Sequence, residues 1–460
     1  MSITLDHAAD ADIRRNKIAP FDRLLRRIET RQARIGIIGL GYVGLPLVGA
    51  IASAGYRVIG CDVDAFKVSE LQAGRSYIRH IASEHIADLV KEKLLTATCD
   101  MAYLREADAI LICVPTPLTA HREPDLSFVV STTEELAPHV REGQLIVLES
   151  TTYPGTTREV MRPILEQSGL HSGEDFFLAY SPEREDPGNA RFSTAQIPKV
   201  IGGDGRLALA LAQALYANIV SGTVPVSTVE TAEAVKLTEN IFRAVNIALV
   251  NELKVVYEAM GIDVWEVIDA AKTKPFGFMP FYPGPGLGGH CLPIDPFYLT
   301  WKAREHGIPT RFIELAGEIN TGMPQHIVER VAFTLDTRRA RALNGAKVLV
   351  LGVAYKSDVE DIRESPALRI IQLLEGRGAV VDYHDPYVPE IPRTREHPEL
   401  AGRRSVVIDH ARLAAYDAVL ICTDHRAVDY GMVVSSAALI VDTRNACGRW
   451  TDDSNAVVKA

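Results

Sequence analysis

The chain has 460 residues, of which 47% are hydrophobic and 23% charged, and its formal net charge is −10 at neutral pH. A chain of this length is expected to form two or three domains, and its acidic balance disfavours nucleic acid as a partner. The first 30 residues lack an apolar core of signal-peptide type, and no run approaches the length of a membrane span. We therefore expect a cytoplasmic protein with no membrane partner.

The six cysteines are widely separated, without Cys-x-x-Cys pairs or a His-rich spacing. This pattern argues against a zinc site and against a disulfide framework. We predict no metal, and we expect most of the cysteines to be reduced and buried.

A glycine-rich motif follows the first strand-like run, which begins at Arg34. In a dinucleotide-binding fingerprint the first glycine permits a tight turn, the second lets the backbone approach a pyrophosphate, and the third allows close helix packing. The glycines at these positions are Gly39, Gly41 and Gly44. The next strand-like run ends at Asp62, about 18 residues further on, where an acid can bind the ribose hydroxyls. A carboxylate repels a 2′-phosphate, so the motif predicts NAD rather than NADP.

Two further apolar runs, residues 109–114 and 145–148, indicate strands of a parallel sheet covered on both faces. Each is followed by a polar loop, residues 115–117 and 149–156. Doubly wound sheets bind ligands at this carboxyl edge. A dense charged turn at residues 181–187 follows, which on its own is most often plain surface.

One long helix is predicted between Thr228 and Met260, a stretch without proline or glycine that ends before Gly261. Roughly 30 residues span about 45 Å, so the helix is expected to bridge domains and to support a dimer interface. Lys236 and Asn240 lie four residues apart and project from one face. Together a cation and an amide can hold an oxyanion, although such a pair also fits an ordinary solvated surface.

Residues 288–291 place Cys291 after two glycines, with Asp295 four residues later. The preceding loop, residues 281–289, is too rich in glycine and proline for regular structure and can wrap a ligand with its N–H groups. A thiol nucleophile beside a hydride acceptor suggests oxidation through a thioester. Without that context, a cysteine such as Cys291 is more often a buried packing residue.

Alternation of strands and helices resumes after Arg330, with strand-like runs at residues 347–351, 379–383, 418–422 and 438–442. This second α/β segment lacks an intact glycine fingerprint. It is therefore expected to hold the nucleotide half of a substrate rather than a second dinucleotide.

In this order the motifs resemble the UDP-glucose/GDP-mannose dehydrogenase family, from Arg34 onward. The matching segments are residues 39–44, 114–117, 150–151, 182–183, 236 with 240, 288–291 with 295, 356 and 361–366. The stretch 274–286 most resembles the branch that oxidises UDP-N-acetylglucosamine for bacterial surface polysaccharides such as O-antigen.

The resemblance implies an α/β fold, with two Rossmann-like doubly wound domains joined by a long central helix and a helical middle domain. The implied domains are an N-terminal extension at 1–32, an NAD-binding Rossmann domain at 33–215, a central helical dimerisation and catalytic domain at 216–330, and a UDP-sugar-binding Rossmann-like domain at 331–460. A homodimer or higher homo-oligomer is expected.

The implied activity is oxidation of a sugar C6 alcohol to a carboxylate with two NAD and one water. A water near Thr151 and Asp295 takes the alcohol proton, Lys236 and Asn240 stabilise the oxyanion, Cys291 attacks the aldehyde, and Glu183 serves thioester hydrolysis. Besides the motif residues named above, cofactor contacts are implied for Tyr42, Val43, Lys67, Pro115, Thr116 and Thr151. Substrate contacts are implied for Glu183, Arg184, Lys236, Asn240, Tyr282, Gly286, Gly288, Lys356 and Arg444.

Two departures from the family pattern bear on the substrate. The corresponding loop of the best-known UDP-glucose enzymes usually reads Pro-Glu-Phe, with a second Glu further on. Here Glu183 is followed by Arg184, Glu185 and Asp186, so no residue is assigned the role of that second acid. The arginine that a neighbouring subunit supplies has no clear match, and Lys272 and Lys274 stand in its place.

The sequence therefore leaves alternatives for the sugar substrate and for the class of protein. UDP-glucose, UDP-GalNAc and UDP-ManNAc remain alternatives to UDP-GlcNAc. A single-step hydroxyacid dehydrogenase of the 6-phosphogluconate type and a non-catalytic nucleotide-sugar-binding protein are the alternatives from other classes.

Overall fold

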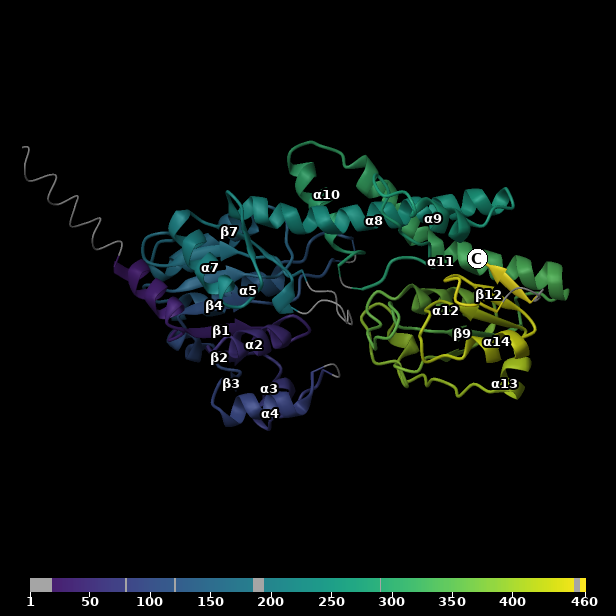
Figure 1. The fold of residues 1–460 in the computed structure, drawn as a ribbon, viewed down its shortest axis with the longest axis horizontal. Coiled ribbons are helices and arrows are strands. Elements are labelled where there is room, and N and C mark those ends of the chain that lie inside the picture. Colours follow the sequence, from purple (N-terminus) through teal and green to yellow (C-terminus); the bar gives the residue numbers. More distant parts are fainter. Residues whose placement is uncertain (1–18, 79–80, 120, 185–193, 290, 451–455) are drawn as a thin grey trace, which may run out of the picture. The chain divides into compact units, whose positions relative to one another are not determined.

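The computed structural model describes residues 19–78, 81–119, 121–184, 194–289, 291–450 and 456–460. The chain divides into two compact units, Met1–Glu239 and Asn240–Ala460. Each unit is built around one β-sheet covered by helices (Figure 1). No helix in this described part of the chain is long and apolar enough to cross a membrane.

The sheet of the first unit has the strand order β3-β2-β1-β4-β5-β6-β7-β8. Its pairs are parallel except for the antiparallel β6 and β7. The first six strands have the dinucleotide-binding order, in which the strand order reverses between β1 and β4. The strands are β1 Arg34–Ile38, β2 Arg57–Cys61, β3 Leu95–Thr98, β4 Ala109–Ile112, β5 Leu145–Leu148, β6 Phe177–Tyr180, β7 Lys199–Gly203 and β8 Thr223–Pro225.

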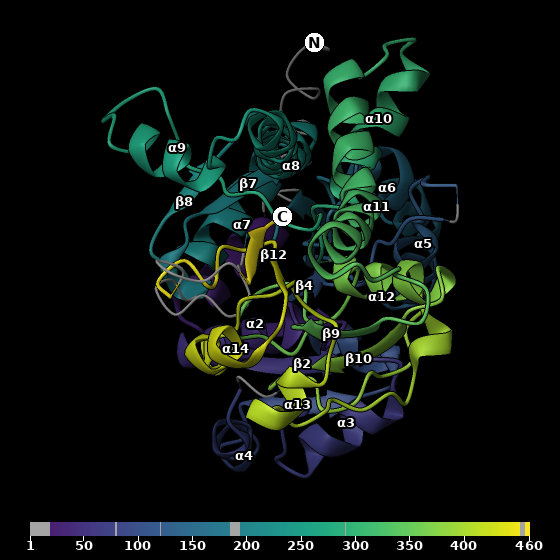
Figure 2. The same ribbon diagram turned by 90° about the vertical axis from the view of Figure 1, so that its right-hand side faces the viewer.

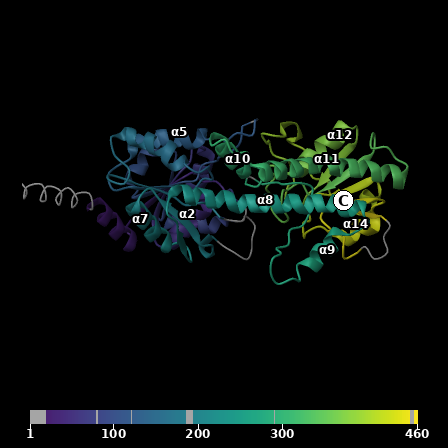
Figure 3. The ribbon, with the colours of Figure 1, turned by 90° about the horizontal axis from the view of Figure 1, so that it is seen from above.

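Helices cover both faces of this sheet because its central strands carry apolar side chains on both sides. Ile35 and Ile37 pack in one cluster with α2 and α7, whereas Ile110 and Ile112 pack in another with α5. Figure 3 shows α5 and α7 on opposite sides. The helices are α2 Gly44–Ser53, α3 Ala65–Gln72, α4 Ser83–Lys91, α5 Ser127–Leu136, α6 Arg162–Leu165 and α7 Arg206–Ala217; shorter turns are η1 Met101–Glu106, η2 Ala137–His139, the π-helix η3 Thr156–Met161, η4 Glu166–Ser168 and η5 Thr194–Gln196.

Residues 19–29 form a helix ahead of β1. Leu24 and Ile28 are buried in the same cluster as α2, and the Tyr56 hydroxyl donates to the Ile28 carbonyl at 2.9 Å. The described end of the predicted N-terminal extension therefore belongs to the core of the first unit.

The long helix predicted before Gly261 is confirmed as α8 Val229–Ala259 (Figure 3). Gly261 adopts a φ of 71°, as expected just after a helix end. Residues 229–239 of α8 belong to the first unit and the remainder to the second. The helices that follow it are α9 Val264–Ala271, α10 Asp295–Glu305 and α11 Arg311–Arg339.

The sheet of the second unit is parallel throughout, in the order β10-β9-β11-β12-β13. Helices α11 and α12 pack on one face, and α13 and α14 on the other (Figure 2). The elements are β9 Lys347–Leu351, α12 Pro366–Gly376, β10 Val380–His384, η6 Pro398–Leu400, α13 His410–Ala414, β11 Ala418–Ile421, α14 Tyr430–Ser436, β12 Ile440–Asp442 and β13 Val457–Lys459. The predicted α/β class with two doubly wound sheets is confirmed, and the four domain boundaries stay predictions.

Candidate active site

The glycine loop between β1 and α2 has the geometry of a dinucleotide cradle. A Cβ on Gly39, whose φ is 90°, would lie 2.5 Å from the Cys113 carbonyl oxygen, and one on Gly44 would lie 1.9 Å from the Gly39 oxygen. Gly41 faces open space, and α2 begins without a side-chain cap or an acidic residue in its first turn. The loop residues Tyr42 and Val43 lead directly into this helix end, whose N–H groups suit a pyrophosphate.

Asp62 lies at the carboxyl end of β2, where the ribose of a dinucleotide is expected. Its carboxylate accepts from the Leu40 N–H at 2.8 Å, from the Asp64 N–H at 2.9 Å and from the Lys67 ammonium at 3.1 Å. The predicted cofactor residues Asp62 and Lys67 therefore form one ion pair, and Asp62 is only 6% exposed. The hydroxyl of Tyr77, which sequence analysis missed, donates to the Leu40 carbonyl and supports the same loop.

The loops after β4 and β5 meet at the carboxyl edge of the sheet. Pro115 is exposed and Thr116 half-buried, and both lie in the loop after β4. The Ser150 hydroxyl donates to the Val114 carbonyl at 2.7 Å, which ties the loop of Thr151 to that of Thr116. The structure thus brings these predicted cofactor residues to the ligand-binding edge.

Glu183 and Lys236 come together within the first unit. Lys236, on α8 and 6% exposed, donates to the Glu183 backbone carbonyl. Arg184 donates to the Pro198 carbonyl at 2.6 Å and pairs with Glu239. The second acid sought after Glu183 falls in residues 185–193, outside the described residues.

Glu233 on α8 is a functional candidate that sequence analysis missed. Its carboxylate is fully buried and accepts from the Gly155 N–H at 2.6 Å and from the Thr157 N–H and hydroxyl at 2.9 and 2.6 Å. Burial raises the pKa of Glu233 to about 7, although the bonds from Thr157 and Gly155 oppose the shift. It fastens the start of the π-helix that follows the Thr151 loop, and Pro163, which lacks an N–H, stands just after that π-helix.

A second buried network lies directly before the Thr151 loop. Glu149 accepts from the Lys199 ammonium and the Tyr216 hydroxyl, and the three residues are at most 3% exposed. Burial alone would lower the pKa of Lys199, but the carboxylates of Glu149 and Glu183 raise it. Burial also raises the pKa of Glu149, although the Lys199 ammonium opposes that shift. The contact between the two side chains holds the end of β5 against β7.

In the second unit, Asn240, Cys291 and Asp295 form the other half of the predicted catalytic set. The Asn240 amide donates to the Asp295 carboxylate, and these residues are 4% and 2% exposed. The Cys291 carbonyl accepts from the N–H groups of Ile294 at 3.1 Å and Asp295 at 2.8 Å. Half-buried Cys291 thus sits one turn before α10. His290 lies outside the described residues.

The glycines before Cys291 allow close packing of the backbone, and their predicted part in binding a ligand stays a prediction. A Cβ on Gly288 would lie 2.6 Å from Tyr355 Cβ, and one on Gly289, whose φ is 82°, would lie 2.9 Å from the Tyr355 ring. The Gly289 N–H donates to the Arg363 carbonyl at 3.0 Å. Gly286, with a φ of 135°, similarly approaches Pro366.

The remaining predicted substrate residues lie in three places in the second unit. Arg444 donates to the Cys422 carbonyl at 2.9 Å, and its guanidinium is 2.6 Å from where a Cβ on Gly284 would stand. Lys356 lies half-buried on the loop after β9. Tyr282 is 42% exposed and donates to Asp269 at 2.7 Å.

The six cysteines are all free, but only three of them are buried, so the expectation that most are buried is wrong. Cys61, Cys422 and Cys447 are the buried ones. Cys99 is exposed and Cys113 half-buried because each stands in a loop just after its strand rather than within the sheet.

The doubly wound sheet, the glycine cradle and the acid after β2 define an NAD-dependent dehydrogenase. Three models of the UDP-glucose/GDP-mannose dehydrogenase family match this chain: the NAD binding domain at residues 33–220, the central domain at 230–322 and the UDP binding domain at 349–449.

Similar proteins act on several nucleotide sugars. A UDP-N-acetyl-D-glucosamine 6-dehydrogenase of Pseudomonas aeruginosa is 37% identical over 78% of this chain and 84% of its own. An NDP-N-acetyl-D-galactosaminuronic acid dehydrogenase of Ralstonia nicotianae is 33% identical over 93% and 98%. The solved UDP-D-ManNAc dehydrogenase of Pyrococcus horikoshii has a TM-score of 0.80 at 33% identity, covering 90% of this chain and 96% of that one.

The chain therefore belongs to the UDP-glucose/GDP-mannose dehydrogenase family, and it is an NAD-dependent oxidoreductase.

Proposed function

We propose that the chain oxidises the C6 hydroxyl of a UDP-N-acetylhexosamine, first of all UDP-GlcNAc, to the corresponding uronate. The reaction consumes two NAD and one water and serves surface polysaccharide synthesis. The observation that carries the proposal is the half-buried Cys291 one turn before α10, with Asp295 held by Asn240. A plain alcohol dehydrogenase has no use for a thiol in that position.

In the first oxidation the C6 hydroxyl loses its proton and the carbon loses a hydride, which gives an aldehyde. Bound NAD supplies the chemistry of both oxidations, because its nicotinamide accepts a hydride. Lys236 and Asn240 are the proposed donors to the developing oxyanion. Among the described residues, the bonds to Glu183 and Asp295 use one of three ammonium protons and one of two amide protons, which leaves each group an N–H for the oxyanion.

In the second oxidation the Cys291 thiolate adds to the aldehyde carbon and forms a C–S bond. Loss of the second hydride from that carbon leaves a thioester on Cys291. Water then adds to the carbonyl carbon, the C–S bond breaks, and the carboxylate and the thiolate are released. Asp295 and Glu183 are the proposed proton acceptors, and Thr151 the proposed water-holding residue.

The choice of an N-acetylated hexose rests on two observations. The relatives described above are named for N-acetylglucosamine, N-acetylmannosamine and N-acetylgalactosamine derivatives. Residues 274–286 resemble the N-acetylglucosamine branch, and no clear counterpart of the arginine of UDP-glucose enzymes precedes Cys291.

A homo-oligomer in the cytoplasm is part of the proposal. Helix α8 carries exposed apolar side chains on one face, with Phe242 48%, Leu249 50% and Val256 41% exposed. Their spacing of seven residues places them on one stripe that a second copy of the chain would cover. Light scattering after gel filtration tests this, and a monomer at micromolar concentration would contradict it.

The test of the substrate is an NADH assay across UDP-GlcNAc, UDP-GalNAc, UDP-ManNAc and UDP-glucose. The proposal expects the highest kcat/KM with UDP-GlcNAc. A preference for another N-acetylated sugar would change the epimer only. A preference for UDP-glucose would contradict the N-acetyl assignment, and no NADH with any of them would contradict the function.

A further inference from the structure

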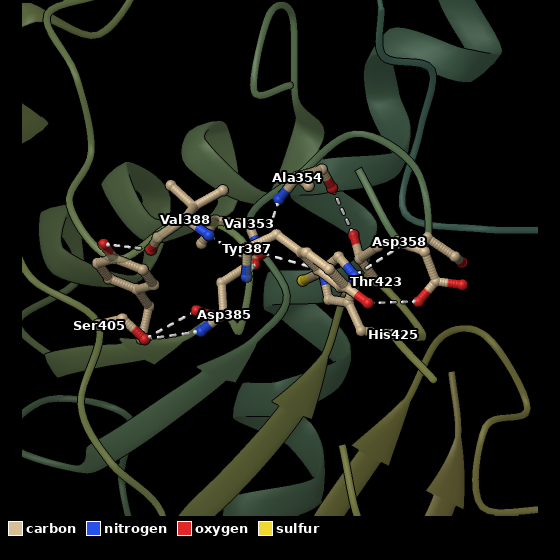
Figure 4. A network of polar contacts seen from close by, with 12 residues as sticks. Val353, Ala354, Asp358, Asp385, Tyr387, Val388, Ser405, Thr423 and His425 are labelled. Atoms are coloured by element: carbon tan, nitrogen blue, oxygen red, sulfur yellow. Dashed lines mark hydrogen bonds and ion pairs between the residues drawn. The ribbon is translucent and has the colours of Figure 1, made fainter. Parts of the chain in front are cut away.

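Asp385, which follows β10, is the centre of a buried polar network in the second unit (Figure 4). One carboxylate oxygen accepts from the N–H groups of Val353 and Ala354 at 2.8 and 3.1 Å, and the other from those of Tyr387 and Val388 at 2.8 and 3.1 Å. Burial would raise the pKa of Asp385, but the hydrogen bonds it accepts hold it below its usual value. An ionised carboxylate is therefore the anchor of two loops.

His425 completes the network and is fully buried. Its Nε2 lies 3.0 Å from Asp385, and its Nδ1 accepts from the Asp358 N–H at 3.0 Å. Because a backbone N–H can only donate, Nδ1 is unprotonated and Nε2 carries the proton. The ring packs on Tyr387 with centroids 5.1 Å apart. His425 thus links the carboxylate of Asp385 to the backbone at Asp358.

Asp385 and His425 both bind the loop of residues 352–365, which joins β9 to α12. Asp385 accepts from the N–H groups of Val353 and Ala354, and His425 accepts from the N–H of Asp358. Two further bonds hold the same loop: the Thr423 hydroxyl donates to the Ala354 carbonyl at 2.6 Å, and the Ser357 hydroxyl donates to Asp424 at 2.7 Å. Gly352, with a φ of 79°, starts the loop at a point where a Cβ would lie 2.5 Å from the backbone carbonyl oxygen of Thr423. The first half of the loop is therefore held in place by hydrogen bonds and close packing with the residues that follow β10 and β11.

The other side of this loop supports the cysteine loop. The Tyr355 Cβ lies where a side chain on Gly288 would stand and the Tyr355 ring where one on Gly289 would stand, and the Arg363 carbonyl accepts from the Gly289 N–H at 3.0 Å. The Tyr355 N–H donates to the Asp361 carbonyl at 2.9 Å, which links the two halves of the loop. Cys291 stands two residues beyond Gly289. A shift of the 352–365 loop would move the backbone that leads into the nucleophile.

We propose that Asp385 and His425 are positioning residues for Cys291, acting through the 352–365 loop. This rests on the proposed function, because it assigns them a part in placing the nucleophile of that reaction. Lys356, the predicted contact to the nucleotide, lies on the same loop. The buried Asp385–His425 pair therefore positions both Lys356, which is predicted to bind the nucleotide, and the thiol of Cys291.

The test replaces His425 with side chains that keep different parts of its contacts. His425→Phe keeps a ring against Tyr387 but removes both hydrogen bonds, His425→Asn keeps an acceptor for Asp358, and His425→Gln keeps a donor for Asp385. Ser405→Ala is the matched control, because the Ser405 hydroxyl bonds the backbone of Asp385 at 2.9 and 3.1 Å and makes no hydrogen bond to the 352–365 loop among the described residues. Thr423→Val is a milder change to the loop for use if His425→Phe does not fold.

Two readouts are needed, of which one does not depend on turnover. The first is the rate of Cys291 alkylation by iodoacetamide in the enzyme without substrate, followed by peptide mass mapping, with exposed Cys99 as the internal reference. The second is kcat and KM per folded molecule. We expect His425→Phe to change the Cys291 alkylation rate severalfold and to lower kcat about 10- to 100-fold, since small misplacements of a reacting group have effects of that size. The KM for NAD should not change.

Partial recovery of kcat in His425→Asn or His425→Gln, with Ser405→Ala behaving as wild type, would support positioning. A loss of thermal stability in His425→Phe and Thr423→Val with unchanged Cys291 alkylation and unchanged kcat would overturn it, because a structural role alone predicts that result. If the unmodified protein oxidises no UDP-sugar, the proposed function fails, and the alkylation rates still decide whether the pair positions Cys291.

Discussion

The buried pair of Glu149 and Lys199 gives the sharpest stability prediction. Lys199→Met keeps most of the side-chain volume but leaves the fully buried Glu149 carboxylate with the Tyr216 hydroxyl as its one side-chain partner in the described part of the chain. Removing one partner of a buried ion pair costs about 3 to 5 kcal/mol, because the other charge stays buried without compensation. For a unit of this size each kcal/mol moves the midpoint by about 2 to 4 °C. We therefore expect the first unit of Lys199→Met to melt about 6 to 20 °C lower.

The matched variant is Lys199→Met with Glu149→Gln, which removes both charges and keeps an acceptor for the Tyr216 hydroxyl. Replacing both members of a buried pair is often neutral or stabilising, so the double variant should recover most of the loss. Differential scanning calorimetry of the four proteins of this cycle gives the coupling. The assignment of a charged buried pair would be wrong if Lys199→Met unfolded at the same midpoint temperature as the wild type. It would also be wrong if the double variant unfolded at no higher a midpoint than Lys199→Met.

Three further predictions concern the cofactor, the catalytic helix and a buried amine. Asp62→Asn should weaken the binding of NAD about 10- to 100-fold and allow NADP to bind, because the ribose loses a charged acceptor while Lys67 remains to pair with a 2′-phosphate. Equal kcat/KM of the wild type with both cofactors would refute this prediction. Lys236→Ala should lower kcat about 100- to 1000-fold with a smaller change in the substrate KM; near-normal turnover with weaker binding would show that Lys236 only neutralises the diphosphate. Burial lowers the pKa of Lys254 from 10.5 to about 8. Between pH 8 and 10.5 the unfolded chain therefore binds more protons than the folded chain, and the contribution of Lys254 to the free energy of unfolding rises with pH across that window. Urea unfolding should therefore show Lys254→Met more stable than wild type by up to about 3 kcal/mol at pH 7, with the gain falling towards pH 10, whereas a pH-independent gain would contradict the assignment.

Local patterns predicted the elements whose determinants lie close together in the sequence. The glycine spacing with Asp62 predicted the cradle, the run without proline or glycine predicted α8, and the four-residue spacings predicted which side chains share a helical turn. Period and spacing report local backbone geometry directly, so these interpretations needed no knowledge of the fold.

The partners of buried charges could not be predicted in the same way. Asp385 and His425 are 40 residues apart, and Glu233 meets Gly155 across 78. Each of these residues is an ordinary polar residue in its own segment, and only the sheet topology brings it to its partner. The same holds for the glycines before Cys291, which pack against Tyr355 from a loop more than 60 residues further on. β13 was missed because three residues near the end of the chain carry too short a pattern.

The most direct test of the account is the number of NADH molecules formed per molecule of UDP-sugar consumed, measured to completion in the wild type and in Cys291→Ser. The thioester route predicts two NADH and a uronate product in the wild type. It predicts that Cys291→Ser binds substrate and NAD but does not complete the four-electron oxidation, because a serine hydroxyl lacks the nucleophilicity of a thiolate. One NADH per sugar in the wild type, or normal steady-state turnover to the uronate in Cys291→Ser, would contradict the central claim.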